Sequence, residues 1–182
     1  CVFSIKKLMK SKGNIVFLGM MGSGKSTIGK LFSEKMKLDF CDIDRYIEDK
    51  LHMSISKIFK EKGEEFFRKF EEKTTLNILR KKNTVISLGG GAFLNKNIQN
   101  EILSNHLSFW LKLDAEILIK RISNNKKRPL VMNLSKNELS DLIKKRSNVY
   151  SKALYSVNCN SLTKIEVINK IINIYETYRT KS

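Results

Sequence analysis

Residues Gly19–Ser26 have the sequence GMMGSGKS, which matches G-x-x-x-x-G-K-[ST], the pattern of a loop that wraps nucleotide phosphates. The apolar segment 14–18 before it is typical of a buried strand, and residues 27–37 after it carry apolar side chains at helical spacing. The motif requires this order of strand, glycine loop and helix. We therefore predict a phosphate site at this loop.

Each residue type in the loop suits a negatively charged ligand. Glycine lets the backbone approach phosphates closely, and the N–H groups of a helix N-terminus point at the anion. We expect Lys25 to contact the β- and γ-phosphates and the Ser26 hydroxyl to ligate Mg²⁺. The residues expected to bind the nucleotide here are Gly22, Ser23, Gly24, Lys25, Ser26 and Thr27.

Apolar segments of strand length alternate with segments of helical periodicity along the chain. The predicted strands are 14–18, 39–42, 84–88, 107–113 and 154–158, and the predicted helices are 25–37, 44–51, 54–81, 95–104, 114–123, 138–152 and 163–180. This alternation favours an α/β fold in which helices cover both faces of a parallel sheet. Ligands of such sheets bind beyond the carboxyl ends of the strands.

The length of 182 residues suits a single domain, 1–182, with a candidate N-terminal extension at 1–12. No apolar run approaches the ~20 residues of a membrane span. Three cysteines lack metal-site spacing, which favours reduced thiols in a cytoplasmic protein. His52 and His106 fit no ligand cluster, and we expect both to be surface or partly packed residues.

The chain is strongly basic, with 35 Lys and Arg residues, 18 Asp and Glu residues and a formal net charge of +17. Such a charge is compatible with nucleic-acid binding. The lysines are nevertheless spread over the whole sequence, without an arginine-rich block or interleaved aromatic residues. We therefore expect no nucleic-acid partner, and we expect the positive field to attract anionic substrates.

Two carboxylates, Asp42 and Asp44, follow the second predicted strand. In an extended chain the period of two places both on one side at the strand end. One could hold Mg²⁺ through water, and the other could accept a proton from an attacking hydroxyl. A simpler interpretation is that Asp44 caps a helix beginning at Arg45. Beside a phosphate loop we favour the functional interpretation.

Glycines and arginines supply the other candidate features. For Gly89–Gly91, close approach of the backbone to a ligand is a better explanation than a plain turn. Arg68 could pair with Glu64 at i,i+4 or grip a substrate carboxylate with two parallel bonds. The polar segment 124–137, which contains Arg128, is either a solvated loop or a lid that excludes water from a phosphoryl transfer; we expect a lid.

Together these motifs resemble the shikimate kinase family over nearly the whole chain. The resemblance rests on their common order: the loop Gly19–Gly29, Asp42-x-Asp44, Phe67-Arg68-x-x-Glu71, Gly89–Gly91, Arg128-Pro129-Leu130, and Arg146 with Tyr150. It implies a P-loop kinase with a five-stranded sheet and a mobile lid. That family moves the γ-phosphoryl group of ATP to the 3-hydroxyl of shikimate, in chorismate and aromatic amino acid biosynthesis. We expect a monomer with these two small-molecule partners.

The resemblance also implies residue roles. Asp44 would bind shikimate hydroxyls and orient the attacking one, while Glu71 would orient Arg68. Arg121 would stack on adenine, and Arg128 would touch the phosphoryl group from the lid. The implied residues are, for catalysis, Lys25, Asp44 and Arg128; for the nucleotide, the loop residues with Arg121 and Arg128; for shikimate, Asp44, Arg68, Gly89, Gly90, Gly91 and Arg146; and for Mg²⁺, Ser26 and Asp42.

One departure and two alternatives accompany this interpretation. Asn148-Val149 stand where the family usually has Pro-Leu, although the spacing from Arg146 to Tyr150 is intact. The first alternative is a kinase for another acceptor, such as gluconate or a nucleoside monophosphate. The second is a non-enzymatic nucleotide-gated or nucleic-acid-binding protein; the chain lacks the Asn-Lys-x-Asp pattern of a GTPase.

Overall fold

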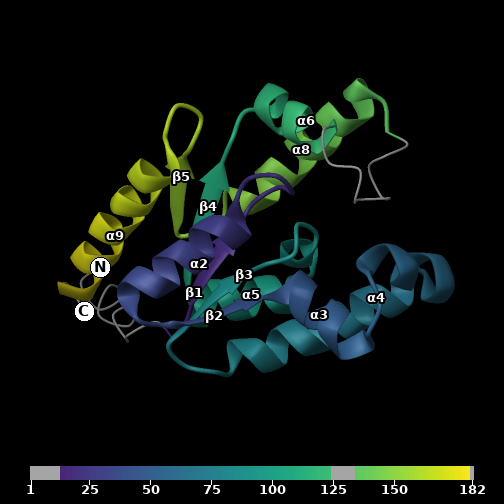
Figure 1. Ribbon diagram of the computed structural model, residues 1–182, viewed down its shortest axis with the longest axis horizontal. Helices are drawn as coiled ribbons and strands as arrows, with labels where there is room; N and C mark the ends of the chain where they lie inside the picture. Colours follow the sequence, from purple (N-terminus) through teal and green to yellow (C-terminus); the bar gives the residue numbers. More distant parts are fainter. Residues whose placement is uncertain (1–12, 124–133, 181–182) are drawn as a thin grey trace, which may run out of the picture.

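Five parallel strands form one sheet within the described residues, 13–123 and 134–180, of the computed structural model (Figure 1). The order across the sheet is β2-β3-β1-β4-β5, and every neighbouring pair is parallel. The strands are β1 (Ile15–Leu18), β2 (Asp39–Asp42), β3 (Thr84–Ser87), β4 (Leu107–Lys112) and β5 (Tyr155–Asn158). The predicted parallel α/β fold is confirmed, with strand ends that differ by one residue from some predicted bounds.

Helices surround the sheet. They are α2 (Lys25–Met36), α3 (Ile43–Leu51), α4 (Ile55–Leu79), the 3₁₀ helix η1 (Ala92–Leu94), α5 (Lys96–Asn105), α6 (Ala115–Ser123), α8 (Lys136–Tyr150) and α9 (Lys164–Thr180). Helices α2 and α9 pack together over one face, whereas α4 and α5 pack together on the other. Right-handed crossovers place α2 on the face opposite α4 and α5, because the chain moves across the sheet in one direction from β1 to β2 and in the other from β2 to β3 and from β3 to β4.

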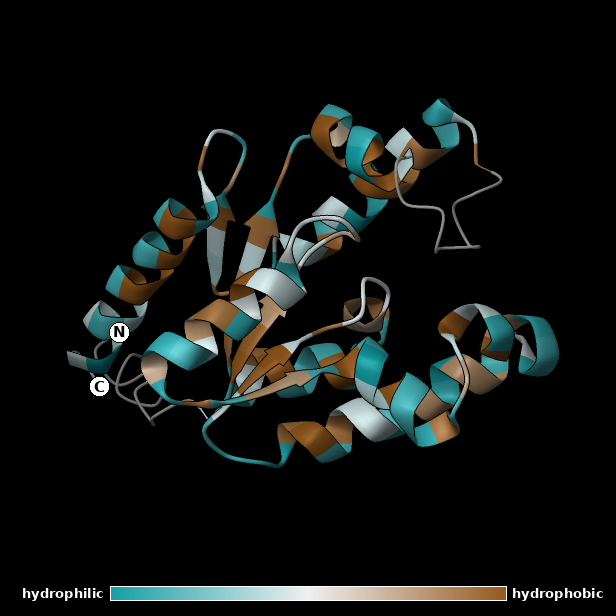
Figure 2. Ribbon diagram, in the orientation of Figure 1, coloured by the Kyte–Doolittle hydropathy of each residue, from teal (hydrophilic) through white to brown (hydrophobic). Residues whose placement is uncertain are grey.

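Apolar side chains fill the space between these layers. Every residue of β1 and β3 is buried, as expected for central strands of a parallel sheet covered on both faces. Figure 2 shows hydrophobic residues on the strands and hydrophilic ones along the outer helix surfaces. Among the described residues, no helix has the length and apolar composition needed to cross a membrane.

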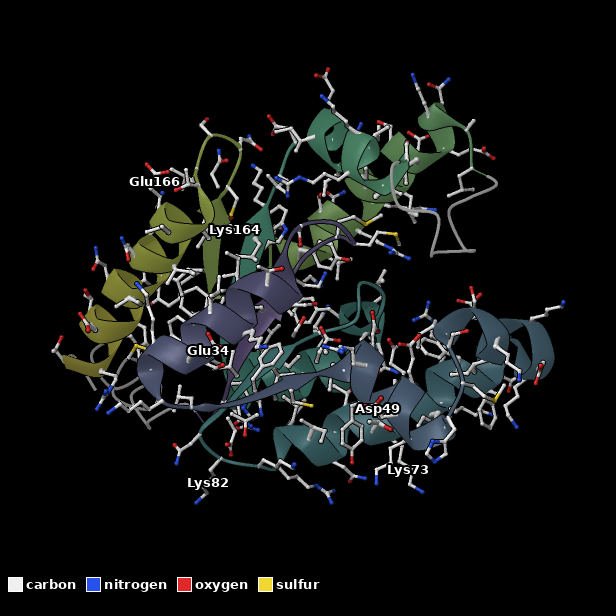
Figure 3. All side chains as sticks on the ribbon, viewed as in Figure 1. Glu34, Asp49, Lys73, Lys82, Lys164 and Glu166 are labelled. Atoms are coloured by element: carbon white, nitrogen blue, oxygen red, sulfur yellow. The ribbon has the colours of Figure 1, made fainter. Side chains whose placement is uncertain are left out.

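Charged side chains are distributed over the surface. Those labelled in Figure 3 are all exposed, and they come from several helices and one loop: Glu34, Asp49, Lys73, Lys82, Lys164 and Glu166. This distribution agrees with the even spread of lysine along the sequence.

The predicted helix 54–81 is interrupted. Gly63 has φ 81° and ψ 168°, which divides α4 into a short first part and a longer second part. The helical stretch is confirmed, but the break at Gly63 was not predicted, because a glycine inside a helical hydrophobic pattern does not by itself reveal one. This backbone region is essentially restricted to glycine.

We expect Gly63→Ala to lower the free energy of unfolding by about 1–3 kcal/mol, the usual cost of a strained backbone. The strain is purely conformational, since a Cβ on Gly63 would have no atom within 4 Å. Chemical denaturation measures the change. Gly13→Ala is the matched control, because Gly13 has no positive φ and its Cβ would make only ordinary contact with His106 at 3.4 Å. Equal stability of both variants would contradict the prediction.

His106 is more deeply placed than expected. Only 4% of it is exposed, so its prediction as a surface or partly packed residue was wrong. Its Nδ1 accepts a hydrogen bond from the backbone N–H of Asn14 at 3.0 Å, and its Nε2 lies 3.4 Å from Glu101. His52 is exposed, as predicted, and ends α3 with φ 50°.

The two ends of the parallel strands differ in their surroundings. Below, the amino edge is the side of the sheet where the strands begin, and the carboxyl edge is the side where they end. The amino edge borders a cavity of about 750 Å³ between α2 and α9, whose lining includes Ile15, Thr84 and Leu107. At the carboxyl edge, β1, β2 and β3 end beside one another, because Phe17 pairs with Ser87 and Ser87 with Asp42. The helix pairs α3–α4 and α6–α8 extend from the sheet on the side of this carboxyl edge (Figure 1).

Candidate functional site

The phosphate loop connects the carboxyl end of β1 to the N-terminus of α2. Gly19, Gly22 and Gly24 have φ values of 142°, 79° and 92°, so the loop conformation depends on glycine at these points. Lys25 is the first residue of α2 and is only 8% exposed. Its Nζ donates to the Met20 carbonyl at 3.0 Å, which holds the ammonium group within the curve of the loop.

Two hydroxyls meet beside the loop. The Oγ of Ser26 lies 3.4 Å from the Oγ of Ser87, the last residue of β3, and Asp42 pairs with Ser87 in the sheet. These oxygen-bearing side chains suit Mg²⁺, which binds few protein groups and keeps water and phosphate ligands. Among the described residues, no group of three or more His, Cys, Asp or Glu could hold a metal alone. Ser87 is not among the residues predicted from the sequence, although a polar residue that ends a buried strand was an available signal.

The two aspartates belong to different elements. Strand β2 ends at Asp42, and Asp44 lies in the first turn of α3, so the period of two does not extend to Asp44. Asp42 is the helix cap, since its Oδ1 accepts from the Arg45 N–H at 3.2 Å. The alternative that Asp44 caps the helix was therefore wrong, and the Asp44 carboxylate faces Gly89 instead.

The glycines after β3 make room for charged side chains. A Cβ on Gly89 would lie 2.7 Å from a carboxylate oxygen of Asp44 and 2.7 Å from one of Glu71. A Cβ on Gly91 would lie 2.7 Å from Nη1 of Arg68. These glycines lack positive φ values, so they provide space, not unusual dihedrals. The close approach predicted from the sequence is present, and its immediate partners are side chains of the protein.

Arg68 is held by two carboxylates of its own helix. Its Nε donates to Glu64 at 3.2 Å and its Nη1 to Glu71 at 2.7 Å. Glu71 is 3% exposed, and burial raises the pKa of its carboxyl while Arg68 limits that rise. Burial disfavours the charge on Arg68, but its carboxylate partners outweigh burial and raise the pKa of the guanidinium. Arg68 is therefore a fixed cation.

Arg146 approaches the same glycines from α8. Its Nη1 lies 3.7 Å from the sulfur of Met20 and would lie 3.7 Å from a Cβ on Gly90. Tyr150, one turn later, donates a hydrogen bond to the Gly90 carbonyl. Burial raises the pKa of Tyr150 to about 12, although Arg146 beside it acts in the opposite direction. The hydroxyl is therefore a donor at neutral pH.

The remaining predicted residues fall in two groups. Arg121 lies on α6 and donates from Nη1 to the Gly22 carbonyl at 3.1 Å, which brings it to the phosphate loop. Arg128 and most of the predicted lid lie outside the described residues. Helix α8 begins at Lys136, two residues before the predicted start, with Ser135 and Glu138 forming a capping box.

Asn148-Val149, which stand where the family usually has Pro-Leu, do not interrupt the helix. Helix α8 runs through Asn148 and Val149 to Tyr150, so Arg146 and Tyr150 share one helix face at i,i+4. The loss of proline therefore leaves this spacing unaltered.

The carboxyl edge thus combines complementary chemical groups. Loop amides and Lys25 suit phosphates, while Arg68 and Arg146 suit a carboxylate. The Asp44 carboxylate, which suits a hydroxyl, lies with Glu71 against Gly89, next to the glycine that Arg146 approaches. Such an arrangement can align a phosphoryl donor with a small anionic acceptor.

Comparison with protein families and curated proteins gives a consistent result. The family model described as shikimate kinase matches residues 21–176. A shikimate kinase of Bartonella quintana (strain Toulouse) is 36% identical over 176 residues, covering 95% of this chain and 84% of the relative. One from Bacillus subtilis (strain 168) is 40% identical over 167 residues, covering 87% of each chain.

Solved structures agree with these sequence matches. Shikimate kinase from Acinetobacter baumannii in complex with shikimate has a TM-score of 0.86 and 28% identity, covering 94% of this chain and 97% of that chain. A gluconokinase from Sinorhizobium meliloti 1021 has a TM-score of 0.57 and 15% identity, covering 94% and 98%, and shares the fold.

Proposed function

Because the chain belongs to the shikimate kinase family, we propose that its phosphate loop binds Mg·ATP and that Arg68 and Arg146 bind the shikimate carboxylate. The chain is an ATP-dependent kinase that transfers the γ-phosphoryl group of ATP to the 3-hydroxyl of shikimate, giving shikimate 3-phosphate and ADP. This reaction belongs to chorismate and aromatic amino acid biosynthesis.

The fixed orientation of the Arg68 side chain supports the residue assignment most directly. A guanidinium held by Glu64 and Glu71 cannot rotate freely, so it presents its remaining donors in one orientation. The fork of donors matches a carboxylate, and Arg146 adds a second cation beside the same glycine loop. A neutral sugar or a nucleobase would gain less from this pair.

On the nucleotide side, loop N–H groups and Lys25 stabilise the negative charge of the phosphates. Ser26 ligates Mg²⁺, and Asp42 supports the ion through water. When bound there, Mg²⁺ would supply positive charge beside the phosphates. Arg121 would stack on adenine, and Arg128, outside the described residues, stays the residue that we propose for contact with the phosphoryl group.

Asp44 receives the attacking hydroxyl. Its carboxylate can accept the hydroxyl hydrogen bond, which aims the oxygen at the γ-phosphorus, and it can take up the proton as the new P–O bond forms. Glycine at 89 permits this placement, because a Cβ there would lie 2.7 Å from an Asp44 carboxylate oxygen and force the carboxylate to shift.

The surroundings of the reaction are also part of the proposal. We infer a single domain that acts as a cytoplasmic monomer and binds no nucleic acid. The charge of +17 supports rapid capture of ATP and shikimate, both of which are anions.

The test is ADP release from Mg·ATP with shikimate, beside parallel reactions with gluconate, nucleoside monophosphates and no acceptor. We expect release that depends on shikimate alone. Release with another acceptor would overturn the roles of Arg68 and Arg146. Nucleotide binding without release for any acceptor would favour a nucleotide-gated binding protein.

A further inference from the structure

One buried hydroxyl connects the glycine loop to the helix that carries Arg146. We propose that Tyr150 is a positioning residue. It holds Arg146 and the Gly90 backbone in fixed positions relative to each other, and it thereby sets the affinity for the shikimate carboxylate. This inference rests on the proposed role of Arg146, and no reacting atom touches Tyr150 itself.

The placement of Tyr150 makes its hydroxyl specific. Tyr150 ends α8 and is 1% exposed, and its hydroxyl donates to the Gly90 carbonyl. Its ring packs against Trp110 with centroids 6.2 Å apart. The ring therefore belongs to the core, whereas the hydroxyl is the part that reaches the site. A phenylalanine would keep the packing and remove only the hydrogen bond.

Gly90 lies where three parts of the site meet. A Cβ on Gly90 would lie 3.4 Å from the backbone nitrogen of Met21 in the phosphate loop and 3.7 Å from Nη1 of Arg146. Its neighbours Gly89 and Gly91 face Asp44 and Arg68. A shift of the Gly90 carbonyl therefore moves the glycine loop, which contacts all three side chains proposed to bind shikimate.

Arg146 depends on the same hydroxyl. Tyr150 and Arg146 share one face of α8, and the guanidinium acts electrostatically on the phenol. Removing the hydroxyl leaves the Gly90 carbonyl without this donor and removes a polar neighbour of Arg146. Both changes loosen the carboxylate clamp, while the amides and Lys25 of the phosphate loop keep their own contacts.

The test is Tyr150→Phe, with steady-state kinetics and calorimetric titration of shikimate. We expect the KM and the Kd for shikimate to rise about tenfold, the factor that corresponds to one net hydrogen bond. We expect the KM for ATP to change less than about twofold, because the variant weakens shikimate binding and leaves the nucleotide contacts in place.

The matched control is Tyr155→Phe. Tyr155 lies in β5, and its ring stacks on that of Phe109 with centroids 5.4 Å apart. The variant therefore tests the loss of a phenol hydroxyl away from the glycine loop. A purely structural role of Tyr150 would reduce the active fraction and kcat but leave the KM for shikimate unchanged. That outcome, or equal KM values for both variants, would overturn the proposal.

A double-variant comparison tests the route through Arg146. With Arg146→Lys already present, we expect Tyr150→Phe to raise the KM for shikimate much less than tenfold, because residues that share one function are not additive. Fully additive effects would overturn the coupling. Absence of shikimate phosphorylation by the unmodified protein would instead contradict the proposed function, which keeps the two failures distinct.

Discussion

We expect Lys25→Met to lower kcat for shikimate phosphorylation by on the order of 10²–10³, the usual cost of removing one electrostatic contact to a developing charge. Methionine retains the length and much of the packing of this 8%-exposed side chain, so the fold should persist. The loss concerns the ammonium group, which meets the phosphates only when nucleotide is bound. Single-turnover measurements of the chemical step, beside kcat, provide the check.

Lys30→Met is the control for this experiment, because Lys30 is an exposed lysine of the same helix α2. It should leave kcat within about twofold, as surface substitutions usually have small effects. A comparable loss of kcat in both variants would mean that general charge, and not the position of Lys25, controls the rate.

Arg68→Ala has the second large effect. We expect the KM for shikimate to rise by roughly 10–100-fold, because charge-assisted hydrogen bonds contribute about 1.5–3 kcal/mol. The variant also leaves the 3%-exposed Glu71 without its 2.7 Å partner. Without Arg68, burial raises the pKa of Glu71 further, and the buried carboxyl without its partner lowers the free energy of unfolding. Kinetics at varied shikimate concentration measure the change in KM, and a denaturation curve measures the change in stability.

Two further variants distinguish binding from stability. Arg68→Met combined with Glu71→Gln removes the buried charge, so it should regain stability while the KM for shikimate stays high. Lys69→Ala breaks only the exposed pair with Glu65 and should leave the KM unaltered. An unchanged KM in Arg68→Ala would remove Arg68 from the substrate site.

Much of the site was predictable because its signals are local. Glycines at 19, 22 and 24 are required by the positive φ values of the loop itself, and the helix that follows needs only its own periodicity. Glu64 and Glu71 each lie about one helical turn from Arg68, on opposite sides of it, so their pairing with Arg68 follows from i,i+4 and i,i+3 spacing.

Contacts between distant segments were beyond such signals. Ser87 reaches Ser26 only because β1 and β3 are neighbours in the sheet, and His106 is buried only because β4 lies beside β1. Similarly, Tyr150 meets Gly90 across 60 residues of sequence. Strand order determines these contacts, and strand order is not encoded in the periodicity of any single segment.

The sequence by itself determined the phosphate loop, the alternation of strands and helices, and the set of charged residues available for two anionic substrates. Tertiary structure alone decided which of those charges meet. It brought the Asp44 carboxylate to Gly89 and left space at Gly89 and Gly91 for charged side chains from α3 and α4. The physical reason is that dihedral preferences and periodicity act over a few residues, whereas steric room and charge pairing depend on elements that packing alone brings together.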